Sequence, residues 1–253
     1  MISQLGAYVL FLQLILVTLR RTPCKWNDFI DQSWKVTVES FFTTSMAGFF
    51  VGAIMAVQFA AQVKDFGALG YLGGLATSAT VREVGPLLIA FMLCGKVGAY
   101  TSAELGTMRV TEQIDAIRCL GANPLQEIIL PRFLGIIVAS FLLLGSGLVM
   151  SVLGGIFLGY FLAGVNPEEY VRHIPTILHF GSVASGLFKA FVFAVVLATI
   201  CTYQGYYTTG GAKGVGRAVV TTSVVTMISI VGMDWVTSFI SSSIGKFLFE
   251  VFS

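Results

Sequence analysis

The sequence predicts an all-α integral membrane protein with five membrane-spanning helices. Of its 253 residues, 56% are hydrophobic and only 11% are charged, whereas about a quarter of the residues of a soluble domain are charged. Polar residues are too few to cover a globule of this size. Long apolar stretches also recur along the chain, and a helix of about 20 apolar residues spans a bilayer. The surface is therefore expected to face lipid.

Five apolar stretches are long enough to cross a membrane. They lie at residues 36–61, 84–103, 133–163, 187–203 and 218–240. Their glycines suit the close helix packing that lipid surroundings favour, and these are Gly48, Gly52, Gly145, Gly147, Gly154, Gly155 and Gly159. We expect one membrane domain over residues 1–253, with a helix and linker in residues 1–35 and a five-span core in residues 36–253.

The first apolar stretch, residues 5–19, is shorter than a span and ends in Arg20, Arg21 and Pro23. It is predicted to lie along the membrane interface, and a true span is the alternative. Positive charges follow this stretch and none precedes it, which is unlike a secretory signal peptide.

Positive charges predict the orientation, because lysine and arginine gather on the cytoplasmic side. Most of the positive charges are predicted on one side of the membrane, and these are Arg20, Arg21, Lys25, Lys35, Arg109, Arg118, Arg132, Lys213 and Arg217. The other receives chiefly Lys64, Arg82, Arg172 and Lys246. The N-terminus is therefore expected in the cytoplasm and the C-terminus outside. This places Cys24 and Cys119 in the cytoplasm and Cys94 and Cys201 within spans, so no disulfide is expected.

The most polar stretch lies between the second and third spans and reads ELGTMRVTEQIDAIRCLGANP. It predicts a short helix that Thr111 caps and that ends near Gly121. Ile114, Ile117 and Leu120 would share one face. Such a helix could lie on the bilayer, or it could dock in a groove of a partner ATPase. The residues assigned to docking are Glu104, Met108, Arg109, Glu112, Gln113, Ile114, Asp115 and Ile117.

Three charges within the spans are expected to meet in the outer half of the membrane. Glu83 lies at the outer end of the second span and Lys189 near the outer start of the fourth. Asp234 lies about 24 Å along the fifth span, by helix rise, in a core of about 30 Å. A charge in a span costs about 3 kcal/mol and usually pairs, so Lys189 is predicted to pair with Glu83 or Asp234. The pair could fix helix packing, or it could line the mouth of an outward-facing lipid cavity, where Lys189 or Arg82 meets a phosphate headgroup.

Several other functions are excluded. The glycine-rich stretch at residues 210–218 lacks the GxxxxGK[ST] order of a nucleotide-binding loop, so any ATP would be bound by another chain. His173 and His179 have no cysteine or carboxylate to complete a metal or nucleophile set, so they are predicted loop residues, and no cofactor or catalytic residue is expected. An intramembrane lipid enzyme remains a remote alternative. The net charge of +2 is scattered, which disfavours a nucleic-acid partner.

Residues 81–132, with the stretches GGAKGVGRAVVTTSVV and GMDW, resemble the MlaE (YrbE) permease family. The resemblance implies a homodimeric ABC transporter permease with cytoplasmic ATPase subunits and a partner that carries an MCE domain with a hydrophobic tunnel. Such systems move phospholipids or related lipids between membranes, in a bacterial inner membrane or a plastid envelope. Lys96 stands where the family commonly has arginine, which would weaken a bidentate phosphate or carboxylate contact.

Two rival functions remain. An ion-driven secondary transporter of a hydrophobic solute would carry its own coupling-ion site and often internal repeats, and the sequence shows no repeat. A scaffold without transport activity would leave the charges within the spans without a purpose.

Overall fold

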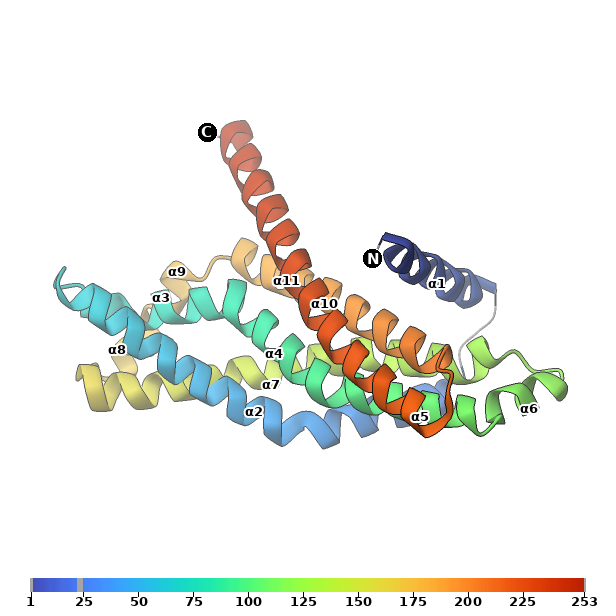
Figure 1. Cartoon of the computed structure of the whole chain (residues 1–253). Coiled ribbons are helices and arrows are strands. Elements are labelled where there is room, and N and C mark those ends of the chain that lie inside the picture. Colours follow the sequence, from blue (N-terminus) through green and yellow to red (C-terminus); the bar gives the residue numbers. More distant parts are fainter. Residues whose placement is uncertain (1, 22–24, 253) are drawn as a thin grey trace. The chain divides into compact units, whose positions relative to one another are not determined.

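The computed structural model describes residues 2–21 and 25–252, with side chains described for residues 5–21 and 25–243 (Figure 1). These ranges form helices joined by turns, which confirms the all-α prediction. Within them, five helical segments are long and apolar enough to cross a membrane, and they are Trp26–Lys64, Leu69–Val110, Leu125–Ala163, Phe180–Tyr206 and Gly211–Ser243. Cys24 lies outside the described residues.

The α-helices in chain order are α1 (Ile2–Arg21), α2 (Trp26–Lys64), α3 (Leu72–Ala79), α4 (Gly85–Leu93), α5 (Ala99–Val110), α6 (Gln113–Cys119), α7 (Leu130–Ala163), α8 (Pro167–Arg172), α9 (Ile174–Ile177), α10 (Phe180–Tyr206) and α11 (Gly211–Phe252). A 3₁₀ turn at Leu69–Tyr71 precedes α3. Three π-helical turns, Thr80–Val84, Cys94–Gly98 and Leu125–Ile129, join α3 to α4, join α4 to α5 and precede α7.

Each spanning segment is longer than the apolar stretch that predicts it, because a helix continues into polar residues beyond the apolar stretch. The second segment begins at Leu69 rather than near residue 84. The prediction that Glu83 lies at the outer end of its span is therefore wrong, since Leu69–Ala79 precede it in helical turns. Lys189 likewise lies well inside α10, which begins at Phe180.

The second segment changes helical pitch next to a proline. Pro86 has no amide hydrogen, so it cannot bond the carbonyl of Arg82 as an α-helix requires. The amide of Gly85 instead bonds the carbonyl of Thr80, five residues earlier. The π-turn before Pro131 has the same form, with the amide of Leu130 on the carbonyl of Leu125. Arg82 and Glu83 thus lie on a π-turn, a feature that is frequent at functional sites.

The chain divides into two compact units. One comprises Met1–Ser40, Phe91–Ser140 and Phe193–Val231, and the other comprises Phe41–Ala90, Phe141–Val192 and Gly232–Ser253. The helices α2, α4, α7, α10 and α11 contribute residues to both units. The single domain over residues 1–253 stays a prediction.

In the second unit, α2 and α7 touch backbone to backbone. A Cβ on Gly48 would overlap the backbone of Gly147, and one on Gly52 would overlap that of Ser151. These contacts confirm the prediction of close packing at Gly48, Gly52 and Gly147. Gly145 departs from it, because a Cβ there would meet nothing within 4 Å.

Tyr170 of α8 completes the core of the second unit. Its side chain is 2% exposed and packs with the buried residues Ala56, Leu72 and Val165. A Cβ on Gly155 would overlap the Tyr170 hydroxyl, so the glycine leaves room for the phenol. The loop between the third and fourth spans is thereby held against the helices.

In the first unit, α1 packs on the end of α10 through aromatic rings. The rings of Tyr8 and Phe11 lie 4.8 and 5.4 Å from that of Tyr203, and Gln204 Nε2 donates to Tyr8 Oη at 2.6 Å. The opposite face of α1 exposes Leu5, Val9, Leu10, Leu14, Leu16 and Val17. The position of α1 at the membrane interface stays a prediction.

Candidate functional site

Lys189 is a buried cation held by three spans. Its side chain is 1% exposed, and its Nζ donates to Glu83 Oε2, to Asp234 Oδ1 at 3.0 Å and to Ser238 Oγ at 2.6 Å. Ser238 Oγ also lies 3.3 Å from Glu83 Oε2. The predicted pairing of Lys189 is confirmed, with both carboxylates rather than one.

Close packing of α10 against the π-turn brings Lys189 to Glu83. A Cβ on Gly186, one turn before Lys189, would overlap the carbonyl of Val81. On the other side, Ser185 and Ser241 place their hydroxyl oxygens 2.9 Å apart and tie α10 to α11. The glycine and the two serines therefore fix the distances across which Lys189 makes its ion pairs.

The cluster holds one more carboxylate than it has cations. The Glu83 side chain is 48% exposed and that of Asp234 is 23% exposed, in contrast to Lys189. Removal of the lysine would leave two carboxylates facing each other within the span region, and an unpaired buried charge is strongly destabilising. Lys189 thus offsets one of the two negative charges of the cluster and joins its helices.

Arg82 lies outside this ion-pair cluster, and among the described residues it forms no salt bridge. It lines an open cavity of about 590 Å³ with Phe180, Phe188 and Ile240, and most of this lining is apolar. Ser185 and Ser241 line the same cavity, so it adjoins the Lys189 cluster. The four predicted residues thus separate into an ion-pair cluster of three and a cationic cavity residue.

The second candidate site is α6. The prediction that Thr111 caps this helix is wrong. Thr111 Oγ1 donates to the carbonyl of Thr107 at 2.9 Å, so Thr111 ends α5 and does not cap α6. Glu112 occupies the cap position, with a left-handed φ of +61° and no capping side-chain bond. The reason is that the chain turns between the two helices, and the hydroxyl of a threonine bonds readily to the carbonyl four residues back.

Asp115 is held by cations of its own chain. It accepts hydrogen bonds from Arg109 Nη1 at 2.6 Å and Arg118 Nη1 at 3.4 Å. Arg118 Nη2 also donates to Tyr206 Oη at the end of α10, and this bond holds the pKa of the Arg118 guanidinium above its ordinary value. The network fixes α6 to the rest of the first unit.

The predicted apolar face of α6 is divided. Ile114 is fully buried, Ile117 is partly buried and Leu120 is 85% exposed. Ile114 therefore anchors α6 to its own chain. The surface that α6 leaves open includes Glu112, Gln113, Ala116, Arg118, Cys119 and Leu120.

The remaining residues assigned to docking are also engaged within the first unit. Glu104 lies 3.3 Å from Arg132 Nη2 and 3.9 Å from Lys35 Nζ, and Arg132 Nη2 lies 3.9 Å from Met108 Sδ. These contacts stiffen the end of the second span where it leads into α6. Lys96, on the π-turn Cys94–Gly98, donates to the backbone carbonyl of Glu39.

Two residues of these sites were missed at the sequence level. Ser238 lies one helical turn after Asp234, and that spacing could have indicated it. Tyr206 follows Arg118 by 88 positions, and no local pattern connects the two residues. Across the described ranges, no three histidine, cysteine or acidic side chains gather in a way that could hold a metal ion.

Comparison with known proteins decides the family. A family model described as Permease MlaE matches residues 29–240, which include α6 and the Lys189 cluster. The chain belongs to the MlaE permease family. It is thus a multi-pass membrane protein and the permease subunit of an ABC transporter.

Similar proteins cover most of this MlaE-family permease. A "Probable ABC transporter permease protein" of Rickettsia bellii is 34% identical over 90% of this chain and 87% of its own. A relative of the same description from Synechocystis is 33% identical over 79% and 76%. The Arabidopsis thaliana protein named "Protein TRIGALACTOSYLDIACYLGLYCEROL 1, chloroplastic" is 28% identical over 84% of this chain and 61% of its own.

Proposed function

We propose that this permease moves phospholipids or related lipids between membranes. The observation that carries the proposal is the cavity of about 590 Å³, where Phe180, Phe188 and Ile240 supply apolar walls and Arg82 supplies a cation. A lipid has the matching chemistry, since its tails prefer an apolar lining and its phosphate accepts two parallel hydrogen bonds from a guanidinium.

Burial divides the roles of the two cations. Lys189 is 1% exposed and already donates to three acceptors, so it has no free face for a headgroup. Its role is to hold the second, fourth and fifth spans in register. Arg82 faces the cavity and is the residue that contacts the headgroup.

The name of the Arabidopsis relative supports a lipid substrate. It contains the word trigalactosyldiacylglycerol, which denotes a lipid with two acyl chains and a sugar headgroup. A headgroup without phosphate would accept hydrogen bonds from Arg82 through its hydroxyls.

Energy would come from cytoplasmic ATPase subunits that bind the ATP and dock on α6. The open surface of Glu112, Gln113, Ala116 and Leu120 offers them both polar and apolar contacts. The resemblance to the family extends the proposal to a homodimer with an MCE-domain partner. The positive charges support an N-terminus in the cytoplasm, with the protein in the inner membrane of a cell, or an N-terminus on the corresponding side of a plastid envelope.

One observation favours the rival function, an ion-driven secondary transporter. The Lys189 cluster holds two carboxylates for one cation, and the Glu83 side chain is 48% exposed, so the cluster has an excess carboxylate open to a coupling cation. Such a carrier would transport its solute without ATP and without a partner subunit.

The test is lipid transfer from proteoliposomes that contain the permease and its co-purified ATPase. Transfer of a fluorescent phospholipid should require ATP and fall about tenfold in Arg82→Ala, because a charge-assisted contact to the headgroup is lost. Arg172→Ala removes an exposed arginine of α8 and is the matched control. Transfer without ATP that follows a proton gradient would instead establish the secondary transporter.

A further inference from the structure

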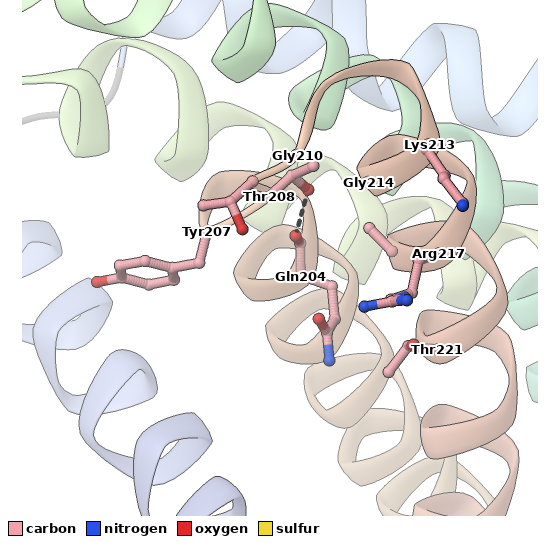
Figure 2. Close-up of a pocket in the computed structure, with 10 residues that line it drawn as sticks. Gln204, Tyr207, Thr208, Gly210, Lys213, Gly214, Arg217 and Thr221 are labelled. Carbon is pink, nitrogen blue, oxygen red and sulfur yellow. Dashed lines mark hydrogen bonds between the residues drawn. The ribbon is translucent and has the colours of Figure 1, made fainter.

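A second cavity lies in the first unit, where α10 ends and α11 begins. Its volume is about 370 Å³, whereas a water molecule takes about 30 Å³ of the liquid. The end of α10 and the turn after it contribute Gln204, Thr208 and Thr209, and α11 contributes Lys213, Arg217 and Thr221. Figure 2 shows Gln204 on α10 and Arg217 and Thr221 on α11, with Lys213 one turn before Arg217.

The cavity carries positive charge without a compensating group. Lys213 and Arg217 both line it, no carboxylate does, and neither cation forms a salt bridge with a described residue. The two stand one helical turn apart, and like charges at that spacing repel each other by a few tenths of a kcal/mol. A bound anion would turn this repulsion into attraction.

Neutral donors surround the cations. Thr209 and Thr221 also line the cavity, and each carries a hydroxyl, whereas the Thr208 hydroxyl already donates to the carbonyl of Gln204 at 2.7 Å. The amide of Gln204 donates to Tyr8. Two cations and two hydroxyls therefore remain for a ligand, a donor set that suits the several acceptor oxygens of a phosphate group.

A rigid turn holds these groups in place. Gly210 and Gly211 have φ values of +92° and +65°, which side chains with a Cβ rarely adopt. A Cβ on Gly214 would overlap the carbonyl of Thr209. The start of α11 is thus packed against the turn that precedes it, which holds the backbone of Lys213 close to that of Thr209.

We infer that this cavity binds a phosphate-bearing anion, held by Lys213 and Arg217 with Thr209 and Thr221. The site is distinct from the Arg82 cavity, which belongs to the other unit, and it does not depend on the proposed direction or identity of the transported lipid. The neighbouring residue Tyr206 bonds Arg118 of α6, so the anion would lie close to the anchor of α6. Its source is either an anionic lipid headgroup or a free phosphate compound.

Binding to the full-length permease in dodecyl maltoside tests the site. One arm titrates a soluble short-chain phosphatidylglycerol and the other titrates inorganic pyrophosphate, both followed by calorimetry. Lys213→Gln/Arg217→Gln should weaken binding about a hundredfold, since two charge-assisted contacts are lost. Lys64→Gln/Arg172→Gln removes the same charge from the other unit and should leave the affinity unchanged. Lys213→Arg/Arg217→Lys keeps both charges and should retain binding, which guards against a folding defect.

Each arm gives a decisive result. Loss of phosphatidylglycerol binding alone in the first double variant supports the site and assigns a lipid headgroup. Loss of pyrophosphate binding supports it and assigns a soluble anion. Equal affinity of the two charge-removing variants for both ligands, or no measurable binding to the wild-type chain, overturns the inference. Because binding is measured without ATP or transfer, failure here leaves the proposed lipid transport standing, and the converse also holds.

Discussion

Lys189 on α10 donates a hydrogen bond of 3.0 Å to Asp234 on α11, although only 1% of the lysine side chain is exposed. A cation this deeply buried is stable only because Glu83 and Ser238 share it. Three of the five spanning segments therefore meet at a single nitrogen, and the predictions for this cluster follow from that geometry.

Lys189→Ala should lower the yield of folded permease severely, because it leaves two carboxylates without their cation. Loss of one partner of a buried ion pair costs about 3–5 kcal/mol. The measurement is the monodisperse fraction after size exclusion, with Lys64→Ala as the exposed control. The exchange Lys189→Glu/Glu83→Lys should recover part of the yield. Normal yield of Lys189→Ala with transport lost would instead assign the lysine to the substrate path.

Gly52→Val should destabilise the permease, because the side chain would enter the backbone of Ser151 and force α2 away from α7. Gly145→Ala is the matched control, since a Cβ there meets nothing within 4 Å and alanine favours a helix over glycine by about 1 kcal/mol. The unfolding temperature in detergent should fall for Gly52→Val and should stay the same or rise for Gly145→Ala. Equal unfolding temperatures would refute the close α2–α7 contact.

Glu112→Lys with Leu120→Asp should release the ATPase while the permease stays folded, because both residues lie on the open surface of α6. Glu112 and Asp115 are both among the residues that the sequence assigned to docking, but Asp115 is bonded to Arg109 and Arg118. Asp115→Lys would therefore disturb α6 itself. Co-purification of the ATPase reports the outcome, and Glu168→Lys on α8 is the control. If the ATPase still co-purifies, α6 does not dock on it, and the alternative that α6 lies on the bilayer is favoured.

No disulfide is expected, and a chain without cysteine should insert and transport normally. Cys119 is exposed whereas Cys94 and Cys201 are buried and unpaired. A maleimide should therefore add to Cys119 on the native permease and reach the two buried thiols only after denaturation, as peptide mass analysis can show. Rapid labelling of Cys201 in the native protein would contradict its burial.

The sequence correctly predicted features that depend only on the distance between residues along a helix. Helix rise is fixed, so it indicated that Glu83, Lys189 and Asp234 would meet, even though the helix ends were wrong. A helix can continue into polar residues beyond its apolar stretch, and hydropathy does not indicate where it ends. The π-turn beside Glu83 could have been predicted from Pro86.

The sequence could not predict which face of α6 is buried against the rest of the chain. Ile114 and Leu120 look alike in a helical pattern, yet one is buried and the other exposed, because burial depends on residues distant in the sequence, which the pattern does not record. Thr111 has the residue type of a cap, but the choice between two adjacent helices depends on where the first one ends.

The most direct test of the account is the lipid that accompanies the purified complex. Lipids would be extracted from equal amounts of wild-type, Arg82→Ala and Arg172→Ala complexes and quantified by mass spectrometry against empty detergent micelles. The account predicts a phospholipid or related lipid enriched with the wild-type and Arg172→Ala complexes and reduced about tenfold with Arg82→Ala. Lipid content that is equal in all three complexes, or no higher than in empty micelles, would contradict it.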